Sequence, residues 1–186
     1  RLFEQADVIA LGPGLGQEAW GRALQEAALT ARKSLVLDAD ALNLLAAAPR
    51  VLPSDTILTP HPGEAARLLG ISTQDVQADR YAAAKNLCER YGCVIVLKGA
   101  GTVIATPGET MRVVAAGNPG MAVGGMGDIL TGIVASLRAQ GLSAFDAACC
   151  GALLHAAAGD AAAQDGGERG LLPSDLFAHV RRLANP

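Results

Sequence analysis

Short apolar runs and longer helical patterns follow one another along the chain. The apolar runs lie within residues 6–14, 34–40, 55–64 and 93–99. The run at 34–40 shows no alternation of polar and apolar residues, which is typical of a strand with both faces covered in a parallel sheet. The segments 102–106 and 111–117 flank a Pro–Gly turn and predict a β-hairpin.

Helical spacing of apolar residues fills the intervals between these runs. The expected helices span residues 17–32, 41–48, 75–91, 127–140, 144–163 and 174–184. The first has a face made of Trp20, Ala23, Leu24, Ala27 and Ala28, and Ser174 is the expected N-cap of the last. Strands that alternate with helices predict one α/β domain over residues 1–186, with a mostly parallel sheet covered on both faces.

Composition narrows the classes of partner. The net charge is −3 and no Lys/Arg run exceeds two residues, so neither nucleic acid nor a membrane is expected as a partner. Cysteine forms no C-x-x-C pair and no metal-spaced set with histidine, which predicts reduced core thiols in a cytoplasmic protein. The four cysteines are Cys88, Cys93, Cys149 and Cys150. Because residue 1 is Arg rather than Met, we expect the chain to be part of a longer polypeptide.

Residues that could perform chemistry gather where the predicted strands end. They lie within 12–16, 38–40, 59–64 and 98–102. The carboxyl ends of parallel strands meet at one edge of a sheet, where ligands of α/β folds bind. The sequence therefore predicts a ligand cleft at this edge.

The stretch GNPGMAVGGMGD, residues 117–128, places glycines directly before a predicted helix. Gly124, Gly125 and Gly127 could turn their N–H groups inward, and the helix start adds free N–H groups and a positive dipole end. This pattern predicts a site for a polyphosphate. Asp128 is an ordinary carboxylate of the first helical turn, an N-cap, or a base that takes a proton from an attacking hydroxyl, and the residues leave these roles open.

Three further candidates each have a structural alternative. GPGLG at 12–16 lacks the last glycine of a dinucleotide fingerprint, so it is either a tight turn or a close approach to a ligand. His61, between two prolines, is either a structural group or a ligand contact. We expect Glu64 to support a helix start, His155 to be packed and His179 to lie at the surface. No residue set has transition-metal spacing.

Five motifs in order carry a resemblance to a known family. LGPGLG, LDADALNLL, LTPHPGE, LKGAGTVI and GNPGMAVGGMGDILTGI make the chain resemble the NAD(P)H-hydrate dehydratases over almost its whole length. The resemblance implies a ribokinase-like three-layer α/β/α sandwich that lacks its first N-terminal segment here. It also implies that an epimerase domain could precede this one, as in many bacterial members.

The resemblance implies an activity as well. Members use ADP, or ATP in other cases, to remove water from the S epimer of hydrated NADH or NADPH. Asp128 would deprotonate the ring hydroxyl, which attacks the terminal phosphorus, and phosphate then leaves. Mg²⁺ bound through the phosphates, ADP as co-substrate and a homo-oligomeric state are expected with it.

Site residues follow from the same resemblance. Those expected at the nucleotide are Lys98, Gly99, Ala100, Gly101, Thr102, Asn118, Gly124, Gly125 and Gly127. Those expected at the hydrated dinucleotide are Gly14, Asp40, Asn43, His61 and Asp128. Two rival functions remain: a kinase of the same fold that acts on a vitamin-precursor alcohol, and a non-catalytic nucleotide-binding module.

Overall fold

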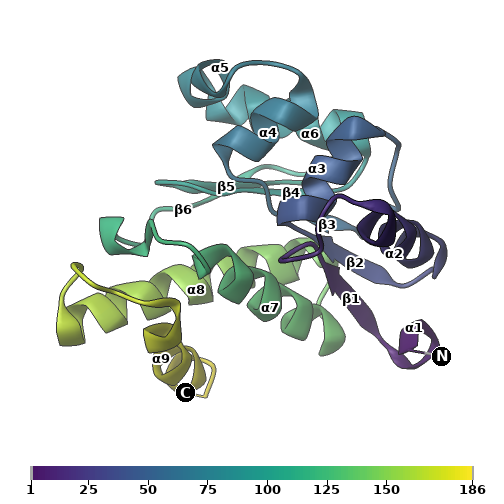
Figure 1. Ribbon diagram of the computed structural model, residues 1–186. Coiled ribbons are helices and arrows are strands. Elements are labelled where there is room, and N and C mark those ends of the chain that lie inside the picture. Colours follow the sequence, from purple (N-terminus) through teal and green to yellow (C-terminus); the bar gives the residue numbers. More distant parts are fainter. Residues whose placement is uncertain (1, 186) are drawn as a thin grey trace.

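A six-stranded sheet forms the centre of the protein, as the computed structural model of residues 2–185 shows (Figure 1). The strands lie side by side in chain order, the first four parallel and the last two antiparallel. They are β1 Val8–Leu11, β2 Ser34–Leu37, β3 Ile57–Leu58, β4 Val94–Leu97, β5 Thr102–Ala105 and β6 Arg112–Val114. The predicted α/β class and the hairpin are confirmed.

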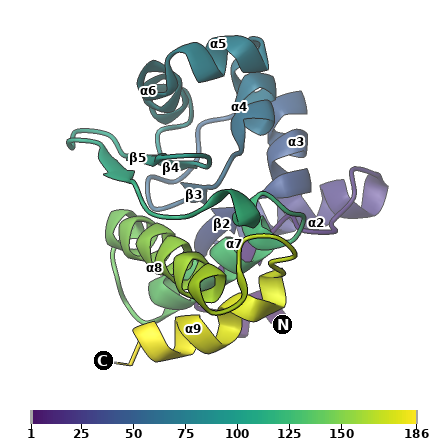
Figure 2. The same ribbon diagram turned by 90° about the vertical axis from the view of Figure 1, so that its left-hand side faces the viewer.

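Helices cover both faces of this sheet (Figures 1 and 2). On one face lie α2 Ala19–Thr30, α3 Ala39–Ala47, α4 Pro62–Leu69, α5 Thr73–Ala78 and α6 Arg80–Tyr91; on the other lie α7 Met126–Ala139 and α8 Ala144–Gly166. α9 Leu176–Leu183 packs outside α8, while α1 Leu2–Gln5 and the 3₁₀ turns η1 Pro119–Met121 and η2 Pro173–Asp175 are short connections. The three-layer α/β/α arrangement is therefore present.

The side chains on the two faces of the sheet pack into two separate hydrophobic cores. Leu35 and Leu37 of β2 point into the core beneath α2 to α6, whereas Val36 between them points to α7 and α8. All three are at most 2% exposed. The apolar run of β2 thus has no polar positions because neither of its faces meets water.

The expected single helix over 75–91 is wrong, because the structure breaks it at Asp79. Asp79 has a non-helical backbone, at φ −144° and ψ 89°, and its side chain accepts a hydrogen bond from the N–H of Ala82. An aspartate in this role starts a new helix, α6, after α5 ends at Ala78. The expected N-cap Ser174 is also wrong: it lies inside η2, and Asp175 precedes α9.

The buried face of α2 matches the predicted one only in part, since Ala28 is buried and Leu24 packs against the core but Ala23 and Ala27 are exposed. Trp20 is 68% exposed, and the buried residues are Gly21, Gln25 and Ala28. A Cβ on Gly21 would stand 2.3 Å from the carbonyl oxygen of Gly16. This close approach fixes the rotation of the helix about its axis. The side that packs on the sheet therefore contains Gly21 and not its neighbour Trp20.

The cysteines are all unpaired, as expected, but they are not all core residues. Cys88 and Cys93 are buried, Cys149 is partly buried and Cys150 is exposed. Burial raises the pKa of the Cys149 thiol to about 11, so this thiol is protonated at neutral pH. Among residues 2–185, no helix is both long and apolar enough to cross a membrane.

Replacing Thr56 by Val should stabilise the fold. The Thr56 hydroxyl is completely buried and has no hydrogen-bond partner within the described residues. Removing an unsatisfied buried hydroxyl at constant shape should raise the free energy of unfolding by about 1 kcal/mol. Thr59→Val is the matched control, because the buried Thr59 hydroxyl donates to the Leu37 carbonyl at 3.3 Å. Urea unfolding should show a higher free energy of unfolding for Thr56→Val and a lower one for Thr59→Val. Equal decreases in both variants would contradict the prediction.

Candidate active site

Three parallel strands deliver polar residues to one edge of the sheet. Asp38 directly follows β2, His61 lies three residues after the end of β3, and Lys98 directly follows β4. The first turn of α7 lies against them, since a Cβ on Gly127 would stand 3.2 Å from Lys98 Nζ and 3.4 Å from Asp38 Oδ2. The ligand edge predicted from the sequence is therefore where the candidate residues meet.

The start of α7 carries backbone donors that the chain itself does not use. Gly125 is the N-cap, with a left-handed backbone at φ 92°. The hydrogen bonds of this turn use the N–H groups of Met126, Asp128 and Ile129. Within residues 2–185, no acceptor is present for the N–H groups of Gly124, Gly125 and Gly127. Unpaired N–H groups at the positive end of a helix form an anion site.

Asp128 stands in the first turn of α7, but it does not cap the helix. The cap is Gly125, and no side-chain capping bond is present at this end. The Asp128 side chain is exposed and makes no hydrogen bond or ion pair with residues 2–185. The capping alternative is thus excluded, and the carboxylate is available to a substrate that enters beside the three free N–H groups.

A buried ion pair lies beneath this turn. Asp38 is 1% exposed, and its Oδ1 accepts from Lys98 Nζ at 2.7 Å. Its Oδ2 accepts from the hydroxyl of Thr131 at 2.9 Å. Thr131 belongs to α7 and was not expected to take part. A buried carboxylate with both oxygens paired is fixed in position, so Asp38 connects the end of β2, the end of β4 and α7.

His61 serves as the N-cap of α4. Its Nδ1 accepts from the N–H of Gly63 at 3.0 Å, and Glu64 accepts from the N–H of His61 at 2.8 Å, which completes a capping box. Because Nδ1 is an acceptor, the neutral ring carries its proton on Nε2, 3.4 Å from Glu64 Oε1. Partial burial lowers the pKa of His61, although Glu64 opposes the shift. The ring thus has a structural role, and half of its surface is still accessible.

The 12–16 loop combines an open glycine with a fixed one. Gly14 has φ 66° and nothing within 4 Å of a hypothetical Cβ, so a ligand can approach its backbone. The N–H of Gly16 donates to Asp40 at 2.8 Å, which ties the loop to α3. Asn43 accepts from Arg67 at 2.8 Å and joins α3 to α4. Asp40 and Asn43 thus hold the 12–16 loop and α4 against α3; direct contact with a ligand stays a prediction.

Arg80 holds the 98–102 loop through hydrogen bonds to its backbone. This role was not predicted from the sequence. Its guanidinium donates to the carbonyl oxygens of Leu97 and Lys98 at 3.1 and 3.2 Å, and to that of Ala100. Gly99, at φ 142°, leaves room for it, because a Cβ there would stand 3.0 Å from the guanidinium. The loop that is expected at the nucleotide is therefore held in one conformation.

Asn118 is tied into the loop before η1. Its amide nitrogen donates to Asp160 of α8 at 3.0 Å, and its oxygen accepts from the N–H of Gly120 at 3.1 Å. Asp160 also accepts from the N–H of Gly117 at 2.9 Å. Asn118 shapes the glycine stretch, and its expected nucleotide contact stays a prediction.

His155 and His179 were expected to be inert. His155 on α8 is partly buried, and this desolvation lowers its pKa to about 4, so the ring is neutral at pH 7. His179 is less exposed than expected: it lies 3.5 Å from Asp165, and 12% of its side chain is accessible.

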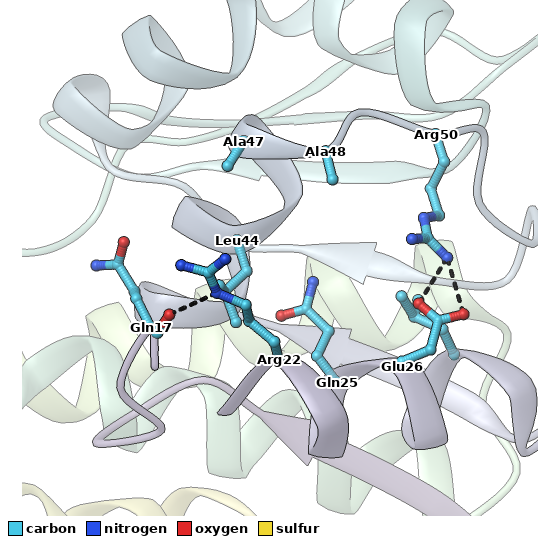
Figure 3. A pocket seen from close by; sticks show the side chains of 9 residues that line it. Gln17, Arg22, Gln25, Glu26, Leu44, Ala47, Ala48 and Arg50 are labelled. Carbon is cyan, nitrogen blue, oxygen red and sulfur yellow. Dashed lines mark hydrogen bonds and ion pairs between the residues drawn. The ribbon is translucent and has the colours of Figure 1, made fainter. Parts of the chain in front are cut away.

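A pocket of about 270 Å³ lies elsewhere, between α2 and α3 (Figure 3). It is lined by Gln17, Arg22, Gln25, Glu26, Leu29, Leu44, Ala47, Ala48 and Arg50. Both of its arginines have partners within the chain: Arg50 pairs with Glu26 at 2.9 Å, and Arg22 donates to the Gln17 carbonyl. It contains neither Asp128 nor the unpaired N–H groups, so we place the active site at the sheet edge and not in this pocket.

Comparison with known proteins identifies the family of this chain. The family described as NAD(P)H-hydrate dehydratase (Carb_kinase) matches residues 1–182. The bifunctional NAD(P)H-hydrate repair enzyme Nnr of Escherichia coli is 51% identical over 99% of this chain and 36% of that protein. The ADP-dependent (S)-NAD(P)H-hydrate dehydratase of Neisseria meningitidis is 44% identical over 96% of this chain and 62% of that protein.

A solved structure is also similar. The ADP/ATP-dependent NAD(P)H-hydrate dehydratase of Bacillus subtilis, co-crystallised with ATP/Mg²⁺, has a TM-score of 0.86 and 34% identity. The alignment covers 96% of this chain and 64% of that one. The chain spans about a third of the bifunctional relatives and about two thirds of the shorter ones. With its ribokinase-like sandwich, the chain belongs to the NAD(P)H-hydrate dehydratase family.

Proposed function

We propose that this protein removes water from the S epimer of hydrated NADH or NADPH at the expense of ADP. One observation carries the proposal. In the described part of the chain, the carboxylate of Asp128 neither caps the helix nor pairs with another group, and it lies in the same turn as three backbone N–H groups without acceptors. A phosphate cradle alone would serve any nucleotide-binding protein, whereas a free carboxylate at its rim is suited to activate a hydroxyl. The name of the Neisseria meningitidis relative supports the same substrates.

The reaction proceeds through a phosphorylated hydrate. Asp128 takes the proton of the ring hydroxyl, whose oxygen attacks the terminal phosphorus of ADP and displaces AMP. The N–H groups of Gly124, Gly125 and Gly127 stabilise the charge that develops on the phosphoryl oxygens. The lone pair of the ring nitrogen then expels inorganic phosphate, a far better leaving group than hydroxide. Loss of a ring proton restores the dihydropyridine, so the net products are NAD(P)H, AMP and phosphate.

Magnesium neutralises phosphate charge when it is bound with the nucleotide. Within residues 2–185, no group of three or more His, Cys, Asp or Glu side chains could hold a metal ion. Asp38, the most buried carboxylate of the site, is already paired with Lys98 and Thr131. This donor set fits an ion that is held through the phosphates rather than in a protein cage. A cytoplasmic location and a homo-oligomeric state belong to the same proposal.

Turnover of hydrated NADH tests the function directly. We expect recovery of NADH absorbance with ADP, at a higher rate than with ATP, and formation of one AMP per NADH. A kinase of a vitamin-precursor alcohol would accumulate a phosphorylated alcohol and restore no NADH. A nucleotide-binding module would bind ADP without turnover. Either of these results would refute the proposed dehydratase activity.

Two variants of His61 separate capping from substrate contact. His61→Ala removes both the cap and the ring, so the free energy of unfolding should fall by about 1 kcal/mol. His61→Asn keeps a good cap and removes only the ring. If the ring contacts the dinucleotide, both variants should raise the KM for hydrated NADH, and ADP affinity in His61→Asn should stay within about threefold, or 0.7 kcal/mol. Normal KM in the stable Asn variant would leave His61 with the capping role alone.

A further inference from the structure

Lys98 lies between two carboxylates that hold it unequally. Its Nζ is 2.7 Å from Asp38 Oδ1 but 3.8 Å from Glu64 Oε2. Both carboxylates are almost fully buried, with 2% and 6% of their side chains accessible, and Lys98 keeps 19%. Burial strengthens both attractions, yet only the shorter one is a hydrogen bond.

The two carboxylates also differ in what else holds them. Asp38 is fixed by the Thr131 hydroxyl on its second oxygen. Glu64 Oε2 already accepts a hydrogen bond from the N–H of His61 at 2.8 Å, so it does not need Lys98 to be satisfied. Lys98 therefore breaks no hydrogen bond when it leaves Glu64, whereas leaving Asp38 would break the 2.7 Å bond that pairs this carboxylate.

The ammonium lies beside the phosphate cradle. A Cβ on Gly127 would come within 3.2 Å of Nζ, so only glycine lets the helix start approach the lysine this closely without displacing it. The N–H of Gly127 is one of the three unused donors. A phosphoryl oxygen bound by these donors would lie within reach of Lys98.

We propose that Asp38 is a positioning residue that anchors Lys98 permanently, and that Glu64 is the partner which Lys98 exchanges for the phosphoryl group of the bound nucleotide. This inference rests on the proposed function for its chemical step. In the free protein, two carboxylates share one ammonium, which leaves a net negative charge beneath the cradle. When the nucleotide binds, Lys98 turns from Glu64 toward the phosphate and stays on Asp38. The lysine thus neutralises charge on the group that is transferred.

Two substitutions distinguish the anchoring role of Asp38 from the exchange role of Glu64. Glu64→Gln keeps the capping box and removes the competing charge, so calorimetry should show ADP bound about 3–10-fold tighter. Asp38→Asn leaves Lys98 without its anchor, so kcat for hydrated NADH should fall at least tenfold. Both effects should disappear when the same substitutions are made in a Lys98→Met background. A purely structural role would instead lower the melting temperature and act equally in both backgrounds.

The matched control is Asp55→Asn. Asp55 also pairs with a cation, Arg138 at 3.4 Å, but it precedes β3 and so lies at the opposite edge of the sheet. This variant should change neither ADP affinity nor kcat. If Glu64→Gln binds ADP no more tightly than the parent, the proposed exchange is wrong. It is also wrong if Glu64→Gln increases ADP affinity equally in the Lys98→Met background. An equal kcat loss from Asp38→Asn in both backgrounds overturns the anchor. ADP binding needs no dinucleotide, so this comparison decides the exchange even if the proposed dehydratase activity fails.

Discussion

Asp128→Asn should lower turnover of hydrated NADH by about 10²–10⁴, the usual contribution of a positioned general base. Asparagine has nearly the same shape but cannot accept the proton of the ring hydroxyl at neutral pH. The melting temperature should hardly change, because the Asp128 side chain makes no contact that the substitution could break. ADP should bind at least as tightly, since a carboxylate beside the phosphates is removed.

Steady-state kinetics, calorimetry and a thermal melt on one preparation test this prediction. Asp146→Asn is the matched control, since Asp146 is also an aspartate in the first turn of a helix, here α8. Its carboxylate is bound to Ser143 at 2.6 Å, so it belongs to a cap and should be dispensable for turnover. Near-parental turnover in Asp128→Asn, or a similar loss in both variants, would remove the base from the mechanism.

The sequence predicted the strands and the ligand edge for a simple physical reason. A strand buried on both faces disfavours polar residues, so β4, and β2 after its first residue Ser34, are visible as apolar runs. Their carboxyl ends then share an edge by topology, whatever the details of packing. The glycines before α7 were informative because backbone donors at a helix start need no side chain.

Other parts of the site depend on contacts between distant residues. Thr131 lies inside α7 and Arg80 begins α6, so each resembles an ordinary helix residue in sequence. Their roles come from partners 93 and 17–20 residues away. The rotation of α2 was missed for the same reason, because the approach of Gly21 to Gly16, and not apolar periodicity, decides which face is buried.

Gly125→Val should weaken ADP binding by roughly 1.5–3 kcal/mol, or about 10–150-fold in Kd, through loss of one charge-assisted backbone contact. Gly125 has φ 92°, a conformation that a β-branched residue adopts only with strain. A Cβ there would also stand 3.0 Å from Cγ of Pro173. The helix start must therefore shift, and the N–H groups that face the phosphate shift with it.

Gly124→Ala is the control that makes this result specific to the cradle. Its Cβ would have nothing within 4 Å, and its N–H group is retained, so ADP affinity should stay near the parental value. Calorimetry with ADP measures both variants, and a thermal melt confirms that each is folded. A folded Gly125→Val variant with parental ADP affinity would show that these backbone donors do not hold the phosphate. Equal weakening by both substitutions would instead indicate that added bulk, and not backbone conformation, disturbs the site.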